Sequence, residues 1–299
     1  MNYVHIALPA GNENIELEHG SLFFVGTATV ILRYAGFTVL TDPNFLHQGE
    51  HIHVGYGLRA ERLTNPAIGI GALPALDLVV LSHMHEDHFD HVATRKLNKM
   101  TPIVTTPQAA KVLKKKRFRI TYPLNTWETL TMLKGENQLR ITALPAKHAP
   151  GILTHMLPPV MGSMLEFETA AGERLLRLYI SGDTLFHKSL KEIPERYSDI
   201  DLALLHLGGT KILGVMLTMD GEQGVEAIKL LNPHEAVPIH FNDYNVFKSP
   251  LDDFRKAVAA AGLEQRVRYL RHGQTYTFTV PESRRRKITE GVSQSDRTI

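Results

Sequence analysis

The segment Ser82-His83-Met84-His85-Glu86-Asp87-His88-Phe89-Asp90-His91 concentrates side chains of the types that bind metal ions. His83 and His85 alternate, so on an extended backbone both imidazoles point the same way and can hold one ion. A turn into a following helix would carry Asp87 and His88 towards a second, neighbouring ion. Four ligand-type residues within six positions, directly after a short apolar run, favour a metal site over a solvated loop that is merely rich in histidine.

The composition restricts how such ions could be held. The chain has 299 residues with 16 histidines and no cysteine, so any ligands must be imidazole and carboxylate groups rather than thiolates. With 33 basic and 31 acidic residues the net charge is +2, which gives no electrostatic footprint for nucleic acid. The short basic runs at 114–117 and 284–287 are expected to be a solvated face and a tail.

Two ions need about three to four protein ligands each, more than one segment supplies. Three distant residues fit the requirement, because each follows a strand-like run: His148, Asp183 and His240. Sheets of α/β proteins collect ligands at the carboxyl ends of their strands. We therefore expect these three side chains to complete the site that the first segment begins.

Further polar residues are expected around the site. Asp90 is predicted to orient an imidazole. Asp42 and Asp220 are predicted either to do the same, or to line the pocket, or to act as a turn former and a helix cap. His206 is expected to be an ordinary buried residue at a strand end, because nothing in its spacing requires a metal.

Two loops are expected to determine substrate recognition, since loops after strand ends usually carry specificity. The first holds His47, His51 and His53 together with Tyr56 and Arg59, and is long enough to overhang the site. The second, at 241–244, directly follows the last predicted ligand.

The elements that must position these residues form an alternation typical of an α/β protein. Antiparallel strands are expected at the start, at 22–30, 31–34 and 37–41, and further strands at 78–81, 103–105, 139–144, 161–168, 174–180, 202–205 and 236–239, with edge strands at 267–270 and 276–280. Helices are expected at 92–97, 107–114, 220–231 and 251–261.

No linker-like segment divides residues 15–280, so we expect one domain over residues 1–281 and a polar tail over residues 282–299. The beginning of the chain lacks the pattern of a secretory signal, and its apolar stretches fall short of the 18 to 20 or so residues that span a bilayer. We therefore expect a cytoplasmic location and no integral membrane segment.

In their order along the chain these motifs resemble those of the metallo-β-lactamase-fold hydrolases, and the resemblance extends over residues 22–255. The shared pattern is two alternating histidines, an Asp-His pair, a third histidine, a bridging aspartate and a last histidine. The resemblance implies a four-layer αββα sandwich with two divalent ions, one on His83, His85 and His148 and the other on Asp87, His88 and His240, with Asp183 bridging them.

The segments 26–32 and 40–43 look like the entrance to the branch that contains ascorbate-6-phosphate lactonase-like and N-acyl-phosphatidylethanolamine phospholipase D-like proteins. That branch commonly has histidine or glutamine where Thr27 stands, so no substrate role carries over to this position. The subclasses B1 and B2 of β-lactamases use a cysteine ligand, and subclass B3 lacks the bridging aspartate. The resemblance therefore implies at most weak, promiscuous β-lactamase turnover.

The expected function is a hydrolase that cleaves an ester-type bond of a small molecule, a lactone or a phosphodiester, with a hydroxide that bridges the two metals. Asp87 and Asp183 are its expected catalytic residues, and the proton for the product side is expected from Asp87 or from a metal-bound water. Zn²⁺ is the expected ion and Mn²⁺ the alternative. A metal-binding sensor without turnover remains the alternative from another class, and a homo-oligomer remains open. An iron-dependent redox enzyme on this fold would normally need a flavin partner domain, for which this chain has no room.

Overall fold

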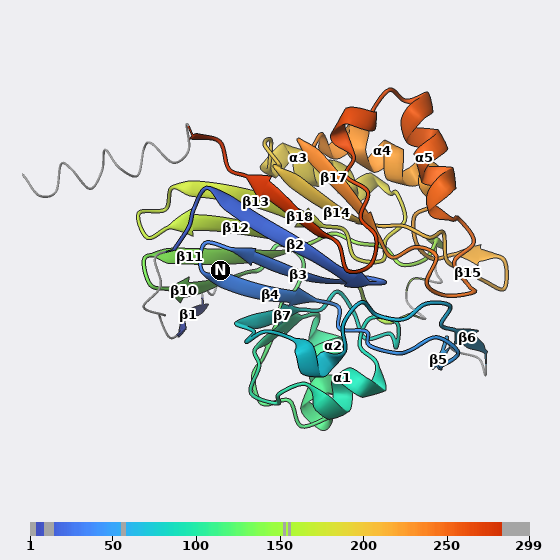
Figure 1. The fold of residues 1–299 in the computed structure, drawn as a ribbon, viewed down its shortest axis with the longest axis horizontal. Helices are drawn as coiled ribbons and strands as arrows, with labels where there is room; N and C mark the ends of the chain where they lie inside the picture. Colours follow the sequence, from blue (N-terminus) through green and yellow to red (C-terminus); the bar gives the residue numbers. More distant parts are fainter. Residues whose placement is uncertain (1–3, 9–14, 55–57, 152–153, 155–156, 283–299) are drawn as a thin grey trace, which may run out of the picture.

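Two seven-stranded sheets form the centre of the protein in the computed structural model, which describes residues 4–8, 15–54, 58–151, 154 and 157–282 (Figure 1). The first sheet has the order β1 (Val4–Leu8), β10 (Thr129–Lys134), β11 (Asn137–Leu144), β12 (Gly162–Thr169), β13 (Arg174–Ile180), β14 (Leu202–His206) and β17 (Glu235–Ile239). The second has the order β18 (Thr275–Thr279), β2 (His19–Gly26), β3 (Thr29–Tyr34), β4 (Phe37–Thr41), β7 (Leu78–Val80), β8 (Ile103–Thr105) and β9 (Thr121–Pro123).

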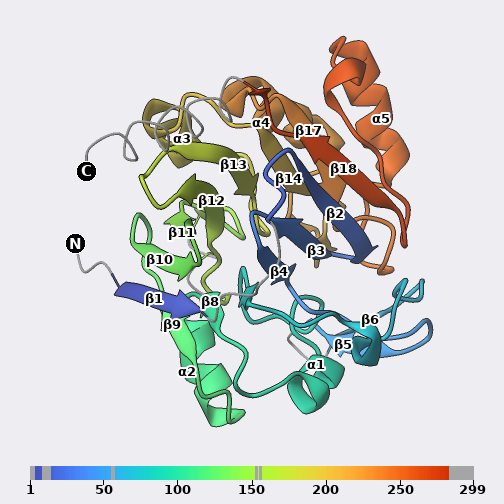
Figure 2. The same cartoon turned by 60° about the vertical axis from the view of Figure 1, so that its left-hand side comes forward.

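Helices cover the outer face of each sheet. The helices α1 (His91–Lys96) and α2 (Pro107–Lys115) lie against the second sheet, and α3 (Glu192–Arg196), α4 (Gly221–Leu231) and α5 (Leu251–Ala260) lie against the first (Figures 1 and 2). Single-turn helices η1 (Ile70–Ala72), η3 (Lys188–Lys191) and η4 (Glu264–Arg266) and the hairpins β5 (His51–His53) with β6 (Arg59–Glu61) and β15 (Lys211–Ile212) with β16 (Val215–Met216) occupy the connections. The predicted four-layer αββα sandwich is confirmed.

The central strands are apolar on both faces because both faces are covered. In β7, Leu78 and Val80 pack between the two sheets, whereas Val79 packs towards α1 and α2. In β14, Leu204 packs between the sheets and Leu205 packs towards the helices on the other side. Alternate residues of a strand point to opposite faces, so a continuous apolar run is what a strand between two layers requires.

Two of the strand predictions are wrong. The run 22–30 is not one strand, because β2 ends at Gly26 and β3 begins at Thr29, with Thr27 in the turn at φ 52°. The segment 267–270 is not an edge strand, since only Val267 pairs with the sheet, through a single bridge to Ala236. Both segments have suitable residues, but a turn and a lack of partners override local propensity.

The ends of several strands meet at one edge of the sandwich. The strands β4, β7 and β8 are mutually parallel, and so are β13, β14 and β17, so their carboxyl ends lie together. The antiparallel strand β12 separates β11 from β13, and β11 therefore runs in the same direction as β13. Every polar residue predicted to bind metal comes directly after one of these strand ends or in the loop that follows it.

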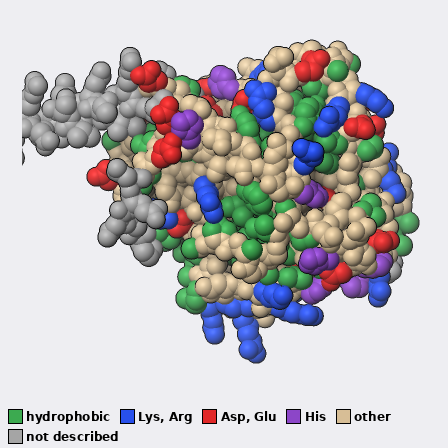
Figure 3. Space-filling model, in the orientation of Figure 1, with side chains coloured by type: hydrophobic (Ala, Val, Ile, Leu, Met, Phe, Trp, Pro, Cys, Tyr) green, Lys and Arg blue, Asp and Glu red, His purple; other side chains and the backbone are tan. Residues whose placement is uncertain are grey.

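Among the described residues, no helix is long and apolar enough to cross a membrane. The expected cytoplasmic location stays a prediction. The predicted tail lies outside the described residues from position 283 onward. The basic run 114–117 is exposed, as expected, at the end of α2, and Lys and Arg side chains project from this part of the molecule (Figure 3).

Candidate metal centre

Three histidines form the first group of possible ligands. Nε2 of His83 lies 2.9 Å from Nδ1 of His85, and Nε2 of His148 lies 3.1 Å from the same atom. His83 and His85 follow β7, and His148 follows β11, so residues far apart in the sequence converge on one point. The three side chains, here called the first group, are close enough to share an ion.

Hydrogen bonds orient the imidazoles of the first group. Nδ1 of His148 donates to the carbonyl of Leu217 at 3.0 Å, and Nδ1 of His83 lies 2.9 Å from the Ser82 hydroxyl. With Nδ1 protonated, each ring leaves the lone pair of Nε2 facing the other histidines. Burial lowers the pKa of His83, lowers that of His148, and lowers that of His85 to about 3, so all three are neutral near pH 7.

Two carboxylates and two histidines form the second group. Nε2 of His88 lies 3.4 Å from Oδ2 of Asp183. Nε2 of His240 lies 3.4 Å from Oδ2 of Asp87 and 3.6 Å from Oδ1 of Asp183. Nδ1 of His240 donates to the carbonyl of Leu207 at 3.0 Å, which turns the other nitrogen towards the carboxylates. These four side chains, here called the second group, could also share an ion.

The second group is held together by charge. Burial alone would lower the pKa of His88, but the carboxylates of Asp183 and Asp87 raise it well above its usual value. Burial would also lower the pKa of His240, but the carboxylates of Asp183 and Asp87 raise it above its usual value. The two histidines hold the pKa of both carboxyl groups below the usual range, against burial. Asp183 also acts on the first group, since its charge opposes the fall in the pKa of His83.

The second group contains two buried polar atoms, Nε2 of His88 and Oδ1 of Asp183, that have no hydrogen-bond partner among the described residues. An unpaired polar atom in the interior costs about 1–3 kcal/mol, so a native site normally satisfies it. A divalent cation would take the place of the His88 proton and accept a lone pair from each of the two atoms. Hydrogen bonds among the four residues leave these two atoms unpaired, whereas a bound metal ion would pair both. The arrangement therefore fits a metal ion.

Asp42 connects the two groups. Its Oδ2 accepts the Ser82 hydroxyl at 2.9 Å and lies 3.1 Å from Nδ1 of His88, while its Oδ1 accepts the Ser82 amide at 2.7 Å. Burial alone would raise the pKa of Asp42, but contacts with His88 and His206 outweigh this effect and lower the pKa to about 2. Because the Ser82 hydroxyl also contacts His83, this one carboxylate orients a histidine in each group. Of the roles predicted for Asp42, orientation of histidines is the one its contacts support.

The other polar residues differ in outcome. Asp90 makes no hydrogen bond to an imidazole of the described residues, so that prediction is wrong; it caps α1 through the Ala93 amide at 2.7 Å and accepts the Phe45 amide. Asp220 caps α4 through the Gln223 amide at 3.0 Å, as the cap alternative predicted. His206 is buried at the end of β14, as predicted, but its contact with Asp42 could not be inferred from residue spacing.

Thr27 is part of a buried polar cluster beneath the second group. Its carbonyl accepts the His240 amide at 2.6 Å and its own amide donates to Oδ2 of Asp243 at 2.7 Å. The guanidinium of Arg62 donates to the Thr27 hydroxyl and to Asn44, and lies 3.9 Å from Oδ1 of Asp243. Thr27 therefore supports the backbone of His240 instead of facing a substrate, and sequence reasoning missed Arg62.

Replacing Asp243 by asparagine is expected to lower the free energy of unfolding by about 3–5 kcal/mol, because it leaves a fully buried Arg62 uncompensated. The matched control is Asp252→Asn, which removes an exposed partner of Arg255 at the similar distance of 3.8 Å and should cost less than about 1 kcal/mol. Urea unfolding of both variants measures the difference.

The same substitution has a defined pH dependence. Hydrogen bonds from His272 and the charge of Arg62 outweigh burial and lower the pKa of Asp243 in the folded protein below 3.8. The contribution of the Asp243 carboxylate to the free energy of unfolding is therefore complete above pH 3.8 or so, and it is lost as the pH falls through the pKa of Asp243 in the folded protein. The stability gap between the natural chain and Asp243→Asn should narrow on acidification below about pH 4. A constant gap from pH 6 to pH 3 would contradict this assignment.

Gly182 places Asp183 at the end of β13. It has φ +61°, and a Cβ at this position would lie 2.6 Å from the carbonyl oxygen of Met161. Gly172 has a similar φ of +80° with open space around it, and so provides a control. Gly172→Ala should cost about 1–2 kcal/mol from backbone strain alone. Gly182→Ala should lower the free energy of unfolding by more than Gly172→Ala does, and it should also weaken ion binding. Urea unfolding measures the first effect and competition with a chelator the second. Equal losses of stability in the two variants, with unchanged ion affinity, would contradict this role of Gly182.

The surface near the second group carries the loop with several histidines. His53 contacts Glu86, through its amide at 2.7 Å and its Nδ1 at 3.1 Å, so this loop adjoins the metal-binding segment. His51 is exposed, and histidine side chains gather on the side of the molecule that carries β5 and β6 (Figure 3). Tyr56 lies outside the described residues. A role of this loop in substrate recognition stays a prediction.

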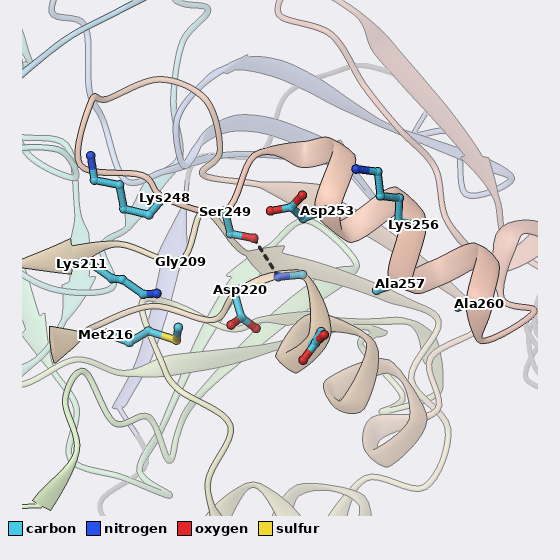
Figure 4. Close-up of a pocket in the computed structure, with 12 residues that line it drawn as sticks. Gly209, Lys211, Met216, Asp220, Lys248, Ser249, Asp253, Lys256, Ala257 and Ala260 are labelled. Atoms are coloured by element: carbon cyan, nitrogen blue, oxygen red, sulfur yellow. Dashed lines mark hydrogen bonds between the residues drawn. The ribbon is translucent and has the colours of Figure 1, made fainter. Parts of the chain in front are cut away.

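A cavity of about 570 Å³ is lined by the segment after β14, the beginning of α4, and α5 with the residues before it (Figure 4). It is lined by residues of both charges, including Lys211, Asp220, Lys248, Asp253 and Lys256, and the seven predicted ligands are not among its lining residues. The hydroxyl of Ser249 accepts the Gly221 amide at 3.1 Å across it. Asp220 thus lines a pocket as well as capping a helix, but this pocket is separate from the two groups.

Comparisons with known proteins agree with this geometry. Residues 38–241 match the family described as "Beta-lactamase superfamily domain". A metal-dependent hydrolase of Archaeoglobus fulgidus is 28% identical over 211 residues, which cover 68% of this chain and 82% of that protein.

Two solved structures have the same fold. An isothiocyanate hydrolase from Delia radicum gut bacteria superposes with a TM-score of 0.72 at 21% identity, covering 87% of this chain and 99% of that one. A metallo hydrolase from Ignicoccus hospitalis superposes with a TM-score of 0.62 at 25% identity, covering 87% of this chain and 98% of that one.

Proposed function

The chain belongs to the beta-lactamase superfamily, and we propose that it is a metal-dependent hydrolase that cleaves an ester-type bond of a small molecule. The proposal is supported above all by the two adjoining groups of buried donors at the strand ends, one of which contains two unpartnered atoms. His83, His85 and His148 would hold one divalent ion and Asp87, His88 and His240 the other, with Asp183 between them.

The two ions would supply a water activated at neutral pH and would polarise the oxygen of the scissile bond. Zn²⁺ is the proposed ion and Mn²⁺ the alternative, since imidazole and carboxylate ligands accept both. With neutral imidazoles, as ion binding requires, the first group has no net charge and the second carries the two negative charges of Asp87 and Asp183.

Accessibility separates the roles of the two carboxylates. The side chain of Asp87 is 12% exposed, whereas that of Asp183 is 2% exposed and accepts the Thr218 hydroxyl at 2.9 Å. Asp87 and the half-buried His85 are the most accessible of the seven, so a substrate would approach from their side. Asp87 is therefore the carboxylate nearest to an approaching substrate; because its lowered pKa keeps it ionised near pH 7, it would accept and relay a proton to the leaving group, and Asp183 would keep the two groups at a fixed spacing.

A hydrolysis panel on the metal-stripped protein, reconstituted with one type of ion at a time, tests this proposal. The panel contains lactones, carboxylic esters, phosphomonoesters, phosphodiesters and a β-lactam, together with an isothiocyanate because of the structural neighbour. We expect turnover of a lactone or a phosphodiester that depends on added Zn²⁺ or Mn²⁺. Turnover of the isothiocyanate alone would remove the ester assignment, and ion binding without any turnover would favour a sensor.

A further inference from the structure

We propose that His206 is a positioning residue for the second group, which holds the Asp42 carboxylate and backs the imidazoles of His88 and His240 without binding an ion itself. The inference rests on the proposed function, because it concerns how well one of the two ions is bound. The sequence around His206 had offered no reason to assign this residue a role.

The hydrogen bonds of His206 define its tautomer. Its Nε2 lies 3.2 Å from Oδ2 of Asp42, and a carboxylate with a low pKa only accepts, so Nε2 carries the proton. Its Nδ1 lies 3.3 Å from the Ser181 hydroxyl, whose oxygen accepts the His206 amide at 2.8 Å. Burial lowers the pKa of His206, which is consistent with a neutral ring held at both nitrogens. The ring is therefore fixed in one orientation.

The ring of His206 also packs on the second group. Its centroid lies 5.8 Å from that of His88, with the planes 11° apart, and 5.6 Å from that of His240, with the planes 33° apart. Both neighbours belong to the second group. A side chain that fills this space keeps the two imidazoles from rotating away from Asp87 and Asp183.

Asp42, His88 and His206 are close enough to form an ion site of their own, but hydrogen bonding explains their arrangement better. Oδ2 of Asp42 already takes the Ser82 hydroxyl and the N–H groups of both histidines. His88 uses Nδ1 on Asp42, which leaves Nε2, an atom without a hydrogen-bond partner, for the second group. An ion at Asp42 would displace the protons that set this orientation.

The two contributions of His206 can be separated by substitution. His206→Gln places an amide nitrogen near the position of Nε2 and keeps the donor to Asp42 while losing the ring. His206→Phe keeps a ring in the stack but has no donor. We expect the phenylalanine variant to weaken ion binding in the second group by about 10- to 100-fold, and the glutamine variant to restore most of the loss.

The test is Zn²⁺ affinity, measured by competition with a chelator in two backgrounds that each keep one group. His85→Ala leaves the second group complete, and His240→Ala leaves the first. The proposal predicts that adding His206→Phe weakens Zn²⁺ binding more in the His85→Ala background than in the His240→Ala background, because Asp42 contacts His88 directly and reaches His83 only through Ser82. His19→Gln, at an exposed histidine at the beginning of β2 that belongs to none of the possible ion groups among the described residues, is the control and should change neither affinity.

Equal losses in both backgrounds, or no loss in the His85→Ala background, would overturn the proposal. A natural chain that binds three Zn²⁺ ions, one of them lost in His206→Phe, would make His206 a ligand and would overturn it as well. If the phenylalanine variant does not fold, His206→Asn replaces it, because the shorter amide cannot reach Asp42. Failure of the natural chain to bind Zn²⁺ would instead refute the proposed function.

Discussion

Asp183→Asn is expected to reduce the hydrolytic activity by at least about 10³-fold, the largest effect that we predict for a single substitution. Two ions contribute several kcal/mol of transition-state stabilisation, and each 1.4 kcal/mol or so corresponds to a factor of ten in rate. Asp183 contacts His88 and His240 in the second group, and its charge also acts on His83 in the first. Asparagine removes that charge at nearly constant volume, so ion binding should fail before folding does.

The measurement is kcat with the best substrate of the panel, together with the number of ions bound per chain. Asp252→Asn is the control, since it makes the same chemical change at an exposed carboxylate on α5. Activity within a factor of ten of the natural chain, with two ions still bound, would show that Asp183 does not link the groups.

Asp42→Asn is expected to weaken the binding of both ions, by about 10- to 100-fold each. Asp42 is an acceptor for every group that it contacts: the amide and hydroxyl of Ser82, and the ring nitrogens of His88 and His206. An asparagine must turn its NH₂ towards at least one of these donors, whichever way the amide is placed. The loss should reach the first group through Ser82 and His83, and the second group through His88.

Asp77→Asn is the matched control for this prediction. Asp77 also accepts a backbone amide, from Thr38 at 2.7 Å, and a side-chain donor, Lys134 at 2.7 Å, but it precedes the amino end of β7, away from the metal centre. The Asp77→Asn variant should have a lower free energy of unfolding than the natural chain but the same affinity for both ions. If Asp42→Asn binds both ions as tightly as the natural chain does, the hydrogen bonds of Asp42 do not set the orientation of the ligands.

Local sequence was sufficient to predict the first segment of the site. The alternation of His83 and His85 and the turn that brings in His88 depend only on neighbouring residues, and the structure places them where that spacing predicts. The distant members, such as His148 and Asp183, were predicted from a general property of sheets, that strand ends share an edge. The shared edge predicts that His148 and Asp183 lie near the site, but it does not predict which side chains they contact there.

The contacts that sequence reasoning missed join separate sheets. His206 and Asp42 are 164 positions apart, at the ends of β14 and β4, and only the packing of the two sheets brings them together. Arg62 is similar, since its charge is balanced by Asp243 on a distant loop, and an arginine in a polar loop is ordinarily solvated. Asp90 was misread for the opposite reason, because its partners are the amides of Phe45 and Ala93, and one of these is a simple helix cap.

The central claim is that two separate groups of this chain each hold one divalent ion. Native mass spectrometry of the chain reconstituted with Zn²⁺ and freed of excess ion counts the bound ions directly. Two ions per natural chain are predicted, with one ion each in His85→Ala and in His240→Ala, and none when the two substitutions are combined. A natural chain that carries no ion, or single variants that both still carry two, would contradict the account.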